Sequence, residues 1–289
     1  MILNICAIWS VFFGSAPLTN FFNVQVDYRI FYPNNLAYHQ FNLNSYSEVT
    51  FDTTKKYIIL THGWVDGFQI DWYNKTIQEF TSHDDTIIIA VGYEEAMNCK
   101  LYVGSVLLLD ALAEQVSSLV LYMRSIGVPM SNIEFVGHSL GAHIAGITGK
   151  KVYSESGYKI RRIFALDPAA PLIPPLKLNA NQRLTKNDAE RVVVIHTSLL
   201  GSQAVLGHVD FYPNGGTSQG ECGKQYISNH LASALYFFCS INDICFNVGY
   251  QCENYNKFKA GQCYSNPNAL MGYHVSDSAE GVYYLDVEC

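Results

Sequence analysis

The pentapeptide Gly137-His138-Ser139-Leu140-Gly141 has the residue types and the spacing of a nucleophile site. A run of strand-forming apolar residues, 133–136, precedes it, and a helical pattern of small residues begins at Ala142. A strand, a sharp turn and a helix in this order are the setting that a nucleophilic serine requires. The two glycines serve the turn, which is too tight for neighbouring side chains. We therefore expect a strained Ser139 above the amino end of the helix, with its hydroxyl exposed.

A serine hydroxyl is a weak nucleophile at neutral pH, so a base must take its proton and a third group must orient that base. In hydrolases with this turn, the acid follows the serine in the chain and the histidine comes last. Asp167 directly follows the apolar run 162–166, at the point where a strand would end. It is the candidate acid, although the pair Asp167-Pro168 also fits a simple turn.

Several of the nine histidines could supply the base. His138 and His143 flank the serine, but His138 lies inside the turn and cannot easily reach Ser139. Three others follow strands or precede glycine and are equally suited to structural hydrogen bonds: His62, His196 and His208. His230 follows a polar loop and begins the helical pattern 231–238, so its ring could swing over the edge of a sheet. Position therefore favours His230 as the base.

An ester hydrolase also needs two backbone N–H groups that bind the developing oxyanion. One is the amide after the nucleophile, which belongs to Leu140. The second should come from the loop after an earlier strand, and the run 57–60 leads into His62-Gly63-Trp64. Gly63 lets the backbone approach closely, so the amide of Trp64 is the second candidate donor. The side chain of Trp64 could equally be a packed aromatic or line an acyl groove.

Strand-like and helix-like segments alternate along the chain. The predicted strands are 57–60, 86–91, 133–136, 162–166 and 191–195, with an edge strand at 24–31. The predicted helices are 102–126 and 144–152. Polar residues follow the strand ends, which indicates an α/β fold: a largely parallel sheet, covered by helices on both faces, with its site at one edge. No Pro- or Gly-rich linker divides the chain, so we expect residues 17–289 to form one domain.

The 289 residues carry a formal net charge of −7, which argues against nucleic-acid binding because that function needs a basic face. The sequence holds no closely spaced Cys or His pairs of the kind that bind a metal, and we expect neither metal nor cofactor. The eight cysteines indicate an oxidising compartment. Asn74-Lys75-Thr76 is a glycosylation sequon, and we expect Asn74 at the surface if it is used.

Residues 1–16 have the pattern of a secretory signal peptide. The run 2–13 is mostly apolar, and the small residues Gly14, Ser15 and Ala16 follow it. A basic start is missing and Pro17 is awkward for cleavage after Ala16, so the cleavage site is left open. A buried strand or a short membrane anchor is the alternative. The run is too short to span a bilayer comfortably, so we expect secretion and no transmembrane segment.

Several blocks in order resemble the pancreatic-lipase family of neutral lipases and sn-1 phospholipases. They lie between about Tyr28 and Leu285: 62–64, 137–141, 166–171, 188–197, 207–216, His230 and 271–274. The resemblance implies an α/β-hydrolase fold with a catalytic triad on Ser139, Asp167 and His230. It also implies a disulfide between Cys252 and Cys263.

Two short loops resemble those of the phospholipase A1 branch of this family, including its insect and venom members. Only residues 198–206 separate Thr197 from Gly207, and the position of the family's lid is reduced to 223–229. Short loops leave the mouth of the site open, so a polar headgroup need not be desolvated against an apolar lid. The resemblance thus implies hydrolysis of the sn-1 ester of phospholipids at a membrane or micelle interface.

Other members of the family define the alternatives. A triacylglycerol or galactolipid lipase is the second enzymatic hypothesis. A non-catalytic lipid-binding protein similar to insect yolk proteins is the third, although such proteins typically lose triad residues. The sequence also departs from the family pattern: Asn229 replaces the cysteine that closes the lid, and Ala232 replaces an arginine. The chain ends at Cys289, so we expect no second β-sandwich domain.

Overall fold

The structure of the protein is a computed structural model that describes residues 24–83, 85–98, 102–170, 178–220, 226–242 and 247–288. The predicted signal peptide at 1–16 lies outside the described residues. So do residues 223–225 of the short lid segment 223–229.

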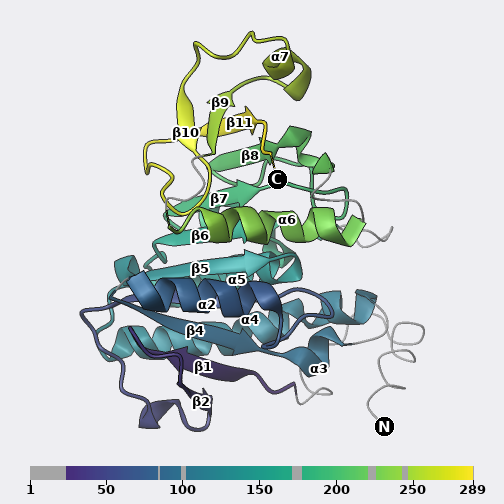
Figure 1. Cartoon of the computed structure of the whole chain (residues 1–289). Coiled ribbons are helices and arrows are strands. Elements are labelled where there is room, and N and C mark those ends of the chain that lie inside the picture. The colour runs from purple at the N-terminus through teal and green to yellow at the C-terminus, as the bar shows by residue number, and fades with distance from the viewer. Residues whose placement is uncertain are drawn as a thin grey trace.

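Within the described residues, eleven strands form one sheet in the order β10-β9-β11-β8-β7-β6-β5-β3-β4-β1-β2 (Figure 1). The strands from β11 to β4 in that order are parallel, and β1, β2, β9 and β10 pair antiparallel at the two ends. The parallel strands are β3 (Lys56–Thr61), β4 (Thr86–Gly92), β5 (Ile133–His138), β6 (Arg162–Leu166), β7 (Arg191–Ile195), β8 (Val209–Pro213) and β11 (Gly281–Leu285). The antiparallel strands are β1 (Asp27–Phe31), β2 (Tyr38–Asn42), β9 (Val248–Gln251) and β10 (Asn268–Leu270).

Helices cover both faces of the sheet, as predicted. The helices α4 (Tyr102–Ser125) and α5 (Leu140–Ser156) pack together behind the sheet in Figure 1, and α2 (Asp71–His83) and α6 (Tyr226–Cys239) lie in front of it. The other helices are the short α3 (Glu94–Met97) and α7 (Tyr255–Lys259). Single 3₁₀ turns occur at Tyr46–Glu48, Met130–Asn132, Ala180–Gln182, Lys186–Asp188 and Asn214–Gly216. This arrangement is the predicted α/β-hydrolase architecture.

The parallel strands are apolar throughout because both of their faces are buried. Successive side chains of a strand point to opposite faces. In β3, Tyr57 and Ile59 therefore join the core beneath α4 and α5, whereas Ile58 and Leu60 join the core beneath α2 and α6. Burial of one face against the core also accounts for α4, which is long and apolar enough to cross a membrane. It packs against α5, and 56% of its most apolar window is buried inside the protein.

Two parts of the sheet differ from the sequence-based expectation. The predicted edge strand at 24–31 is β1, which pairs with both β2 and β4, so β2 is the edge. The sequence analysis predicted the helical pattern 231–238 of α6, but it did not predict α2, α7 or the strands after β7. Among these, β9, α7 and β10 form a small unit that the Cys252–Cys263 disulfide closes, joining the pair of cysteines that the family resemblance implied.

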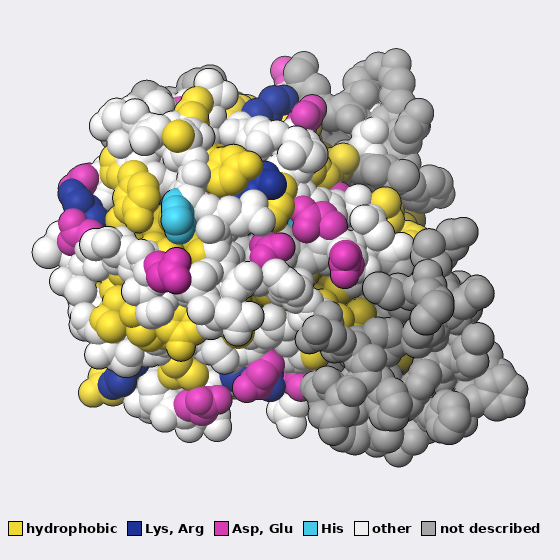
Figure 2. Space-filling view, turned by 90° about the horizontal axis from the view of Figure 1, so that it is seen from below, with side chains coloured by type: hydrophobic (Ala, Val, Ile, Leu, Met, Phe, Trp, Pro, Cys, Tyr) yellow, Lys and Arg dark blue, Asp and Glu magenta, His cyan; other side chains and the backbone are white. Residues whose placement is uncertain are grey.

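Surface charge is dispersed on the face of the protein that Figure 2 shows. Lys and Arg side chains are scattered among acidic ones, and hydrophobic side chains form separate patches between them. Asn74 lies on α2 with an exposed side chain, whereas Thr76 of the same sequon is fully buried. Glycosylation itself stays a prediction.

Candidate active site

The nucleophile elbow lies between β5 and α5. Ser139 has φ 57° and ψ −120°, a left-handed conformation that costs energy for a residue with a side chain. A Cβ on Gly137 would lie 2.7 Å from the carbonyl oxygen of Gly141, and a Cβ on Gly141 would lie 2.2 Å from that of Thr61. Both positions therefore exclude a side chain, which confirms the mechanical role predicted for the two glycines.

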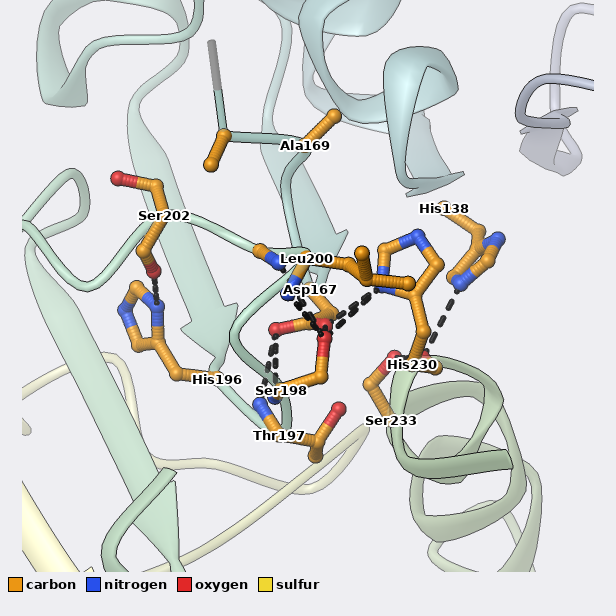
Figure 3. A network of polar contacts seen from close by, with 12 residues as sticks. His138, Asp167, Ala169, His196, Thr197, Ser198, Leu200, Ser202, His230 and Ser233 are labelled. Carbon is orange, nitrogen blue, oxygen red and sulfur yellow. Dashed lines mark hydrogen bonds and ion pairs between the residues drawn. The ribbon is translucent and has the colours of Figure 1, made fainter. Parts of the chain in front are cut away.

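Asp167 directly follows β6 and is fully buried. Its Oδ1 accepts hydrogen bonds from the amides of Thr197 (2.8 Å) and Ser198 (3.3 Å). Its Oδ2 accepts from the hydroxyl of Ser198 and lies 2.6 Å from Nδ1 of His230 (Figure 3). Buried carboxylates are costly unless hydrogen bonds compensate their charge, and four donors compensate this one. The alternative of a simple Asp-Pro turn does not account for this convergence.

His230 lies inside a helix, not on a loop as the sequence suggested, because α6 begins four residues earlier at Tyr226. The polar residues before His230 were taken for a loop, yet they form the first turn of the helix. Since the Asp167 carboxylate only accepts, Nδ1 of His230 carries the hydrogen and Nε2 is left as the basic atom. Burial and the charge of His138 lower the pKa of His230, and the Asp167 carboxylate opposes them.

Ser139 directly follows the carboxyl end of β5, and His230 lies near the start of α6. The ring of His138, next to Ser139 in the chain, lies 4.5 Å from the ring of His230 between centroids. Within the described residues, the Ser139 hydroxyl makes no hydrogen bond to His230. In hydrolases that bond often tightens only when substrate is bound.

The candidate oxyanion donors flank the same serine. Leu140 is the first residue of α5, so its amide has no acceptor inside the helix. A Cβ on Gly63 would lie 2.8 Å from Cβ of Ser139, so the loop before Trp64 passes directly over the elbow. Trp64 is 37% exposed, and its ring packs edge-on against Tyr102 at 5.5 Å. The Trp64 side chain is thus partly a packed aromatic, and its backbone continues the loop that passes over the elbow.

The other candidate histidines make structural hydrogen bonds. His62 Nδ1 lies 3.0 Å from the Gly63 oxygen, and the ring stacks on Tyr93. His143 bonds through both nitrogens, to the oxygen of Ala169 and the amide of Leu184. The remaining two make the following contacts: His196 with Ser202 and Asp210, and His208 with the amide of Val192.

Sequence reasoning missed two residues that contact the site. Ser198 donates its hydroxyl to Asp167 and accepts the amides of Leu200 and Gly201, which wrap the loop around the acid. Asp66 accepts the amide of Gly63 and faces His138. Each lies within three residues of a strand-end block, so polar residues just beyond such blocks were the available signal. Among the described residues, no group of three or more His, Cys, Asp or Glu is placed to hold a metal ion.

Comparisons with known proteins agree with this geometry. The family model described as Lipase matches residues 19–288. Lipase member H-A of Xenopus laevis is 34% identical over 225 residues, 73% of this chain and 47% of that protein. Lipase member H of Rattus norvegicus is 32% identical, over 84% of this chain and 54% of that protein. The chain therefore spans about half the length of these relatives.

A shorter relative is matched along most of its length. Phospholipase A1 of Vespa crabro is 30% identical over 251 residues, which make up 82% of each chain. Among solved structures, a phospholipase/carboxylesterase from Dyadobacter fermentans aligns at a TM-score of 0.35 and 14% identity, over 63% of this chain and 75% of that chain. That structural similarity is too low to bear on function.

Proposed function

The chain belongs to the Lipase family, and on this premise we propose that it is a secreted serine hydrolase of lipid esters, a phospholipase A1 that cleaves the sn-1 acyl ester of phospholipids. One observation carries the proposal: the 2.6 Å contact of Asp167 with Nδ1 of His230, beside a strained Ser139 at the same sheet edge. These three residues are proposed as acid, base and nucleophile. No cofactor or metal takes part in the proposed reaction.

The proposed reaction begins when Nε2 of His230 takes the proton of the Ser139 hydroxyl. The serine oxygen then forms a bond to the ester carbonyl carbon, and the carbonyl oxygen becomes an oxyanion. The amides of Trp64 and Leu140 would donate to that oxyanion. Asp167 keeps the hydrogen of the imidazole on Nδ1 and stabilises the imidazolium that forms.

The tetrahedral intermediate collapses when its bond to the leaving alcohol breaks. His230 gives its proton to that alcohol, which for a phospholipid substrate is the 2-acyl lysophospholipid, and the acyl group remains on Ser139. Water then attacks the acyl-enzyme with His230 again as base. The fatty acid leaves, and the proton returns to the serine oxygen.

Two features support a phospholipid at an interface as the substrate. The similarity to Phospholipase A1 of Vespa crabro covers 82% of both chains, and the loops at 198–206 and 223–229 are short. Large apolar side chains are exposed beside the proposed site residues: Trp64 (37%), Val65 (64%) and Leu199 (55%). Exposed apolar side chains of this kind can enter a lipid surface. Val65 also adopts φ 63°, a backbone conformation that β-branched residues disfavour.

The proposal includes secretion. The apolar run at 2–13 and the disulfide between Cys252 and Cys263 support it, because disulfides persist in oxidising compartments. Residues 17–289 are proposed as the hydrolase domain. The substrate test below uses the protein recovered from the medium of expressing eukaryotic cells.

The experiment compares wild-type protein with Ser139→Ala. Phosphatidylcholine with different acyl chains at sn-1 and sn-2 is offered as vesicles, and a triolein emulsion is offered in parallel. Released fatty acids are identified by mass. We expect wild type alone to release the sn-1 chain, and the variant to stay folded by circular dichroism while losing at least roughly 10⁴-fold in turnover.

Other outcomes would redirect the proposal. Cleavage of triolein alone would favour the triacylglycerol lipase and show that short loops do not select phospholipid. Full activity in Ser139→Ala would contradict the assignment of the nucleophile. Inactivity on both lipids, without labelling of Ser139 by a fluorophosphonate, would favour a lipid-binding protein.

A further inference from the structure

His138 is buried beside the proposed base, and it is the chain neighbour of the proposed nucleophile. It precedes Ser139 directly and is only 2% exposed. Its Nε2 lies 3.2 Å from the backbone oxygen of His230, and the two rings are 4.5 Å apart at an interplanar angle of 47°. Figure 3 shows His138 beside His230, away from the Asp167 side of that ring. Because a carbonyl oxygen only accepts, Nε2 of His138 carries a hydrogen.

Asp66 lies on the other nitrogen of His138. Its Oδ2 accepts the amide of Gly63 at 3.2 Å and is 3.4 Å from Nδ1 of His138, which forms no hydrogen bond among the described residues but is close enough for an ion pair when the ring is protonated. The amide of Asp66 in turn lies 3.4 Å from the oxygen of Gly63. Asp66 therefore belongs to the tight loop that carries Trp64, the proposed oxyanion donor. The side chain of Asp66 is 13% exposed, so solvent screens this contact little.

We propose that His138, held by Asp66, is a positioning residue that joins the oxyanion loop, the nucleophile elbow and the first turns of α6. Each of these three segments supplies one part of the proposed catalytic machinery, and they are far apart in the chain. The Nε2–H of His138 donates to the backbone oxygen of His230 and holds it in place. The ring of His138 packs against the His230 ring on the side away from Asp167. This inference rests on the proposed function of Ser139 and His230.

The charges around His138 give the contact an electrostatic consequence. Asp66 and His230 face it directly, His62 lies beside Asp66, Asp167 lies beyond His230, and Glu94 lies behind the oxyanion loop. Burial would raise the pKa of Asp66, but the imidazoles of His138 and His62 hold it below its usual value. After burial, the charge of His138 is the main cause that lowers the pKa of His230.

Two substitutions at 138 separate the hydrogen bond from the charge. His138→Gln keeps an N–H donor at a similar reach but has no charge. His138→Phe keeps a ring against His230 but has no donor. Without the neighbouring positive charge, the pKa of His230 should rise in both variants. The acidic limb of the pH profile of kcat/KM should therefore move to higher pH, because the base becomes protonated sooner.

The test measures kcat and KM between pH 5 and 9 on p-nitrophenyl butyrate, with the rate of fluorophosphonate labelling of Ser139 and the melting temperature as companions. We expect His138→Phe to lose about tenfold in kcat with little change in KM, and His138→Gln to stay within about threefold of wild type. Asp66→Asn should lose about tenfold in kcat, as His138→Phe does. The loss should be smaller when Asp66→Asn is introduced into a protein that already carries His138→Gln. His39→Gln, exposed on the edge strand β2, is the matched control that should change nothing.

The outcomes separate this inference from the proposed function. If wild type is not labelled by the fluorophosphonate, the proposed function fails. If wild type is labelled and His138→Phe is folded with the kcat and pH profile of wild type, the positioning role is overturned. Equal losses of kcat in His138→Gln and His138→Phe, with the acidic limb of kcat/KM unmoved, would also overturn it. The losses would then come from altered packing alone. Should His138→Phe not fold, the shifted limb in His138→Gln and its coupling to Asp66→Asn decide the question.

Discussion

Two His–Asp pairs lie at the same edge of the sheet, and they differ in what surrounds the ring. His230 contacts Asp167 through Nδ1 alone, and its side chain is 12% exposed. His196 contacts Asp210 through Nε2 at 2.9 Å and the oxygen of Ser202 through Nδ1 at 2.6 Å. It is fully buried and stacks on Tyr212 with ring centroids 4.2 Å apart. A contact between histidine and aspartate is therefore not sufficient for a general base.

The hydrogen-bond partners explain the difference. Both partners of the His196 ring are acceptors, so with Asp210 ionised both nitrogens carry hydrogen and neither can take a proton. His230 has an acceptor on one nitrogen only, which leaves the other basic. A buried ring with two satisfied nitrogens is a structural element, whereas a partly exposed ring with one satisfied nitrogen can exchange protons.

The structural pair supports the proposed catalytic one. His196 and Asp210 hold the loop between β7 and β8: Asp210 accepts the amides of Leu206 and Gly207. The start of that loop supplies the amides of Thr197 and Ser198, which bind Asp167. The buried ion pair thus fixes the loop that orients the acid of the other pair.

The largest expected effect is on activity, at His230. His230→Ala should lower kcat/KM by roughly 10⁴-fold or more, because the substitution removes the proposed base for the serine proton. The free energy of unfolding should fall by less than in a variant that removes His196, since three hydrogen-bond donors remain on Asp167. Ester hydrolysis and urea unfolding of the same preparation measure both. Activity within tenfold of wild type would mean that the base lies elsewhere.

His196→Ala should have the opposite profile. The substitution leaves Asp210 buried without its partner, so the free energy of unfolding should fall by about 3–5 kcal/mol. Urea denaturation measures this loss, and His39→Ala on the exposed edge strand is the control. If the variant were as stable as the control and as inactive as His230→Ala, the division of roles between the two pairs would be wrong.

His143 extends the comparison to a buried ring that is neutral. The amide of Leu184 donates to its Nδ1, and burial lowers its pKa to about 4 from an ordinary value of 6.5. Between these values the unfolded chain binds a proton that the folded chain does not, so stability falls as pH falls from 6.5 to 4 and is regained as pH rises. The loss from this group is about 3 kcal/mol.

The measurement for His143 is urea unfolding of wild type and His143→Gln at several pH values. Gln keeps one donor and one acceptor but does not titrate. Burial also lowers the pKa values of His62 and His230, and both remain in each protein, so the difference in slope isolates His143. Parallel stability curves for the two proteins would show that His143 is not held neutral.

The smallest expected effect is at Ser198. Ser198→Ala removes one donor from Asp167, which should lower kcat by about tenfold. The carboxylate then holds the imidazolium more strongly, so the pKa of His230 should rise and the acidic limb of kcat/KM should move to higher pH. Ser198→Thr keeps the hydroxyl and should preserve the limb. If the acidic limb does not move in Ser198→Ala, the Ser198 hydroxyl is not needed at Asp167. The amides of residues 197 and 198 would then be sufficient to hold its carboxylate.

Much of the fold could be predicted from local pattern. The apolar runs correctly located β3 to β7, and the helical spacing located α4 and α5, because the buried face of each element leaves a regular apolar pattern in the sequence. The last four strands and α2 were missed. Strands such as β9 have polar and exposed positions, and their pairing with β11 and β10 depends on contacts that no local pattern reports.

Local sequence pattern was enough to predict the elbow at Ser139 and the strand end at Asp167. Glycine spacing and apolar runs fix the backbone conformation of neighbouring residues, so they can be read without tertiary contacts. The sequence also narrowed the base to a few histidines, and chain order favoured His230. The different roles of His230 and His196 could not be predicted from local pattern. Their aspartate partners lie 63 and 14 residues away in the chain, and the burial of each ring depends on packing from the whole sheet. Asp66 and Ser198 were missed for the same reason. Their partners, His138 and Asp167, come close to them only when separate strand ends are brought to one edge of the sheet.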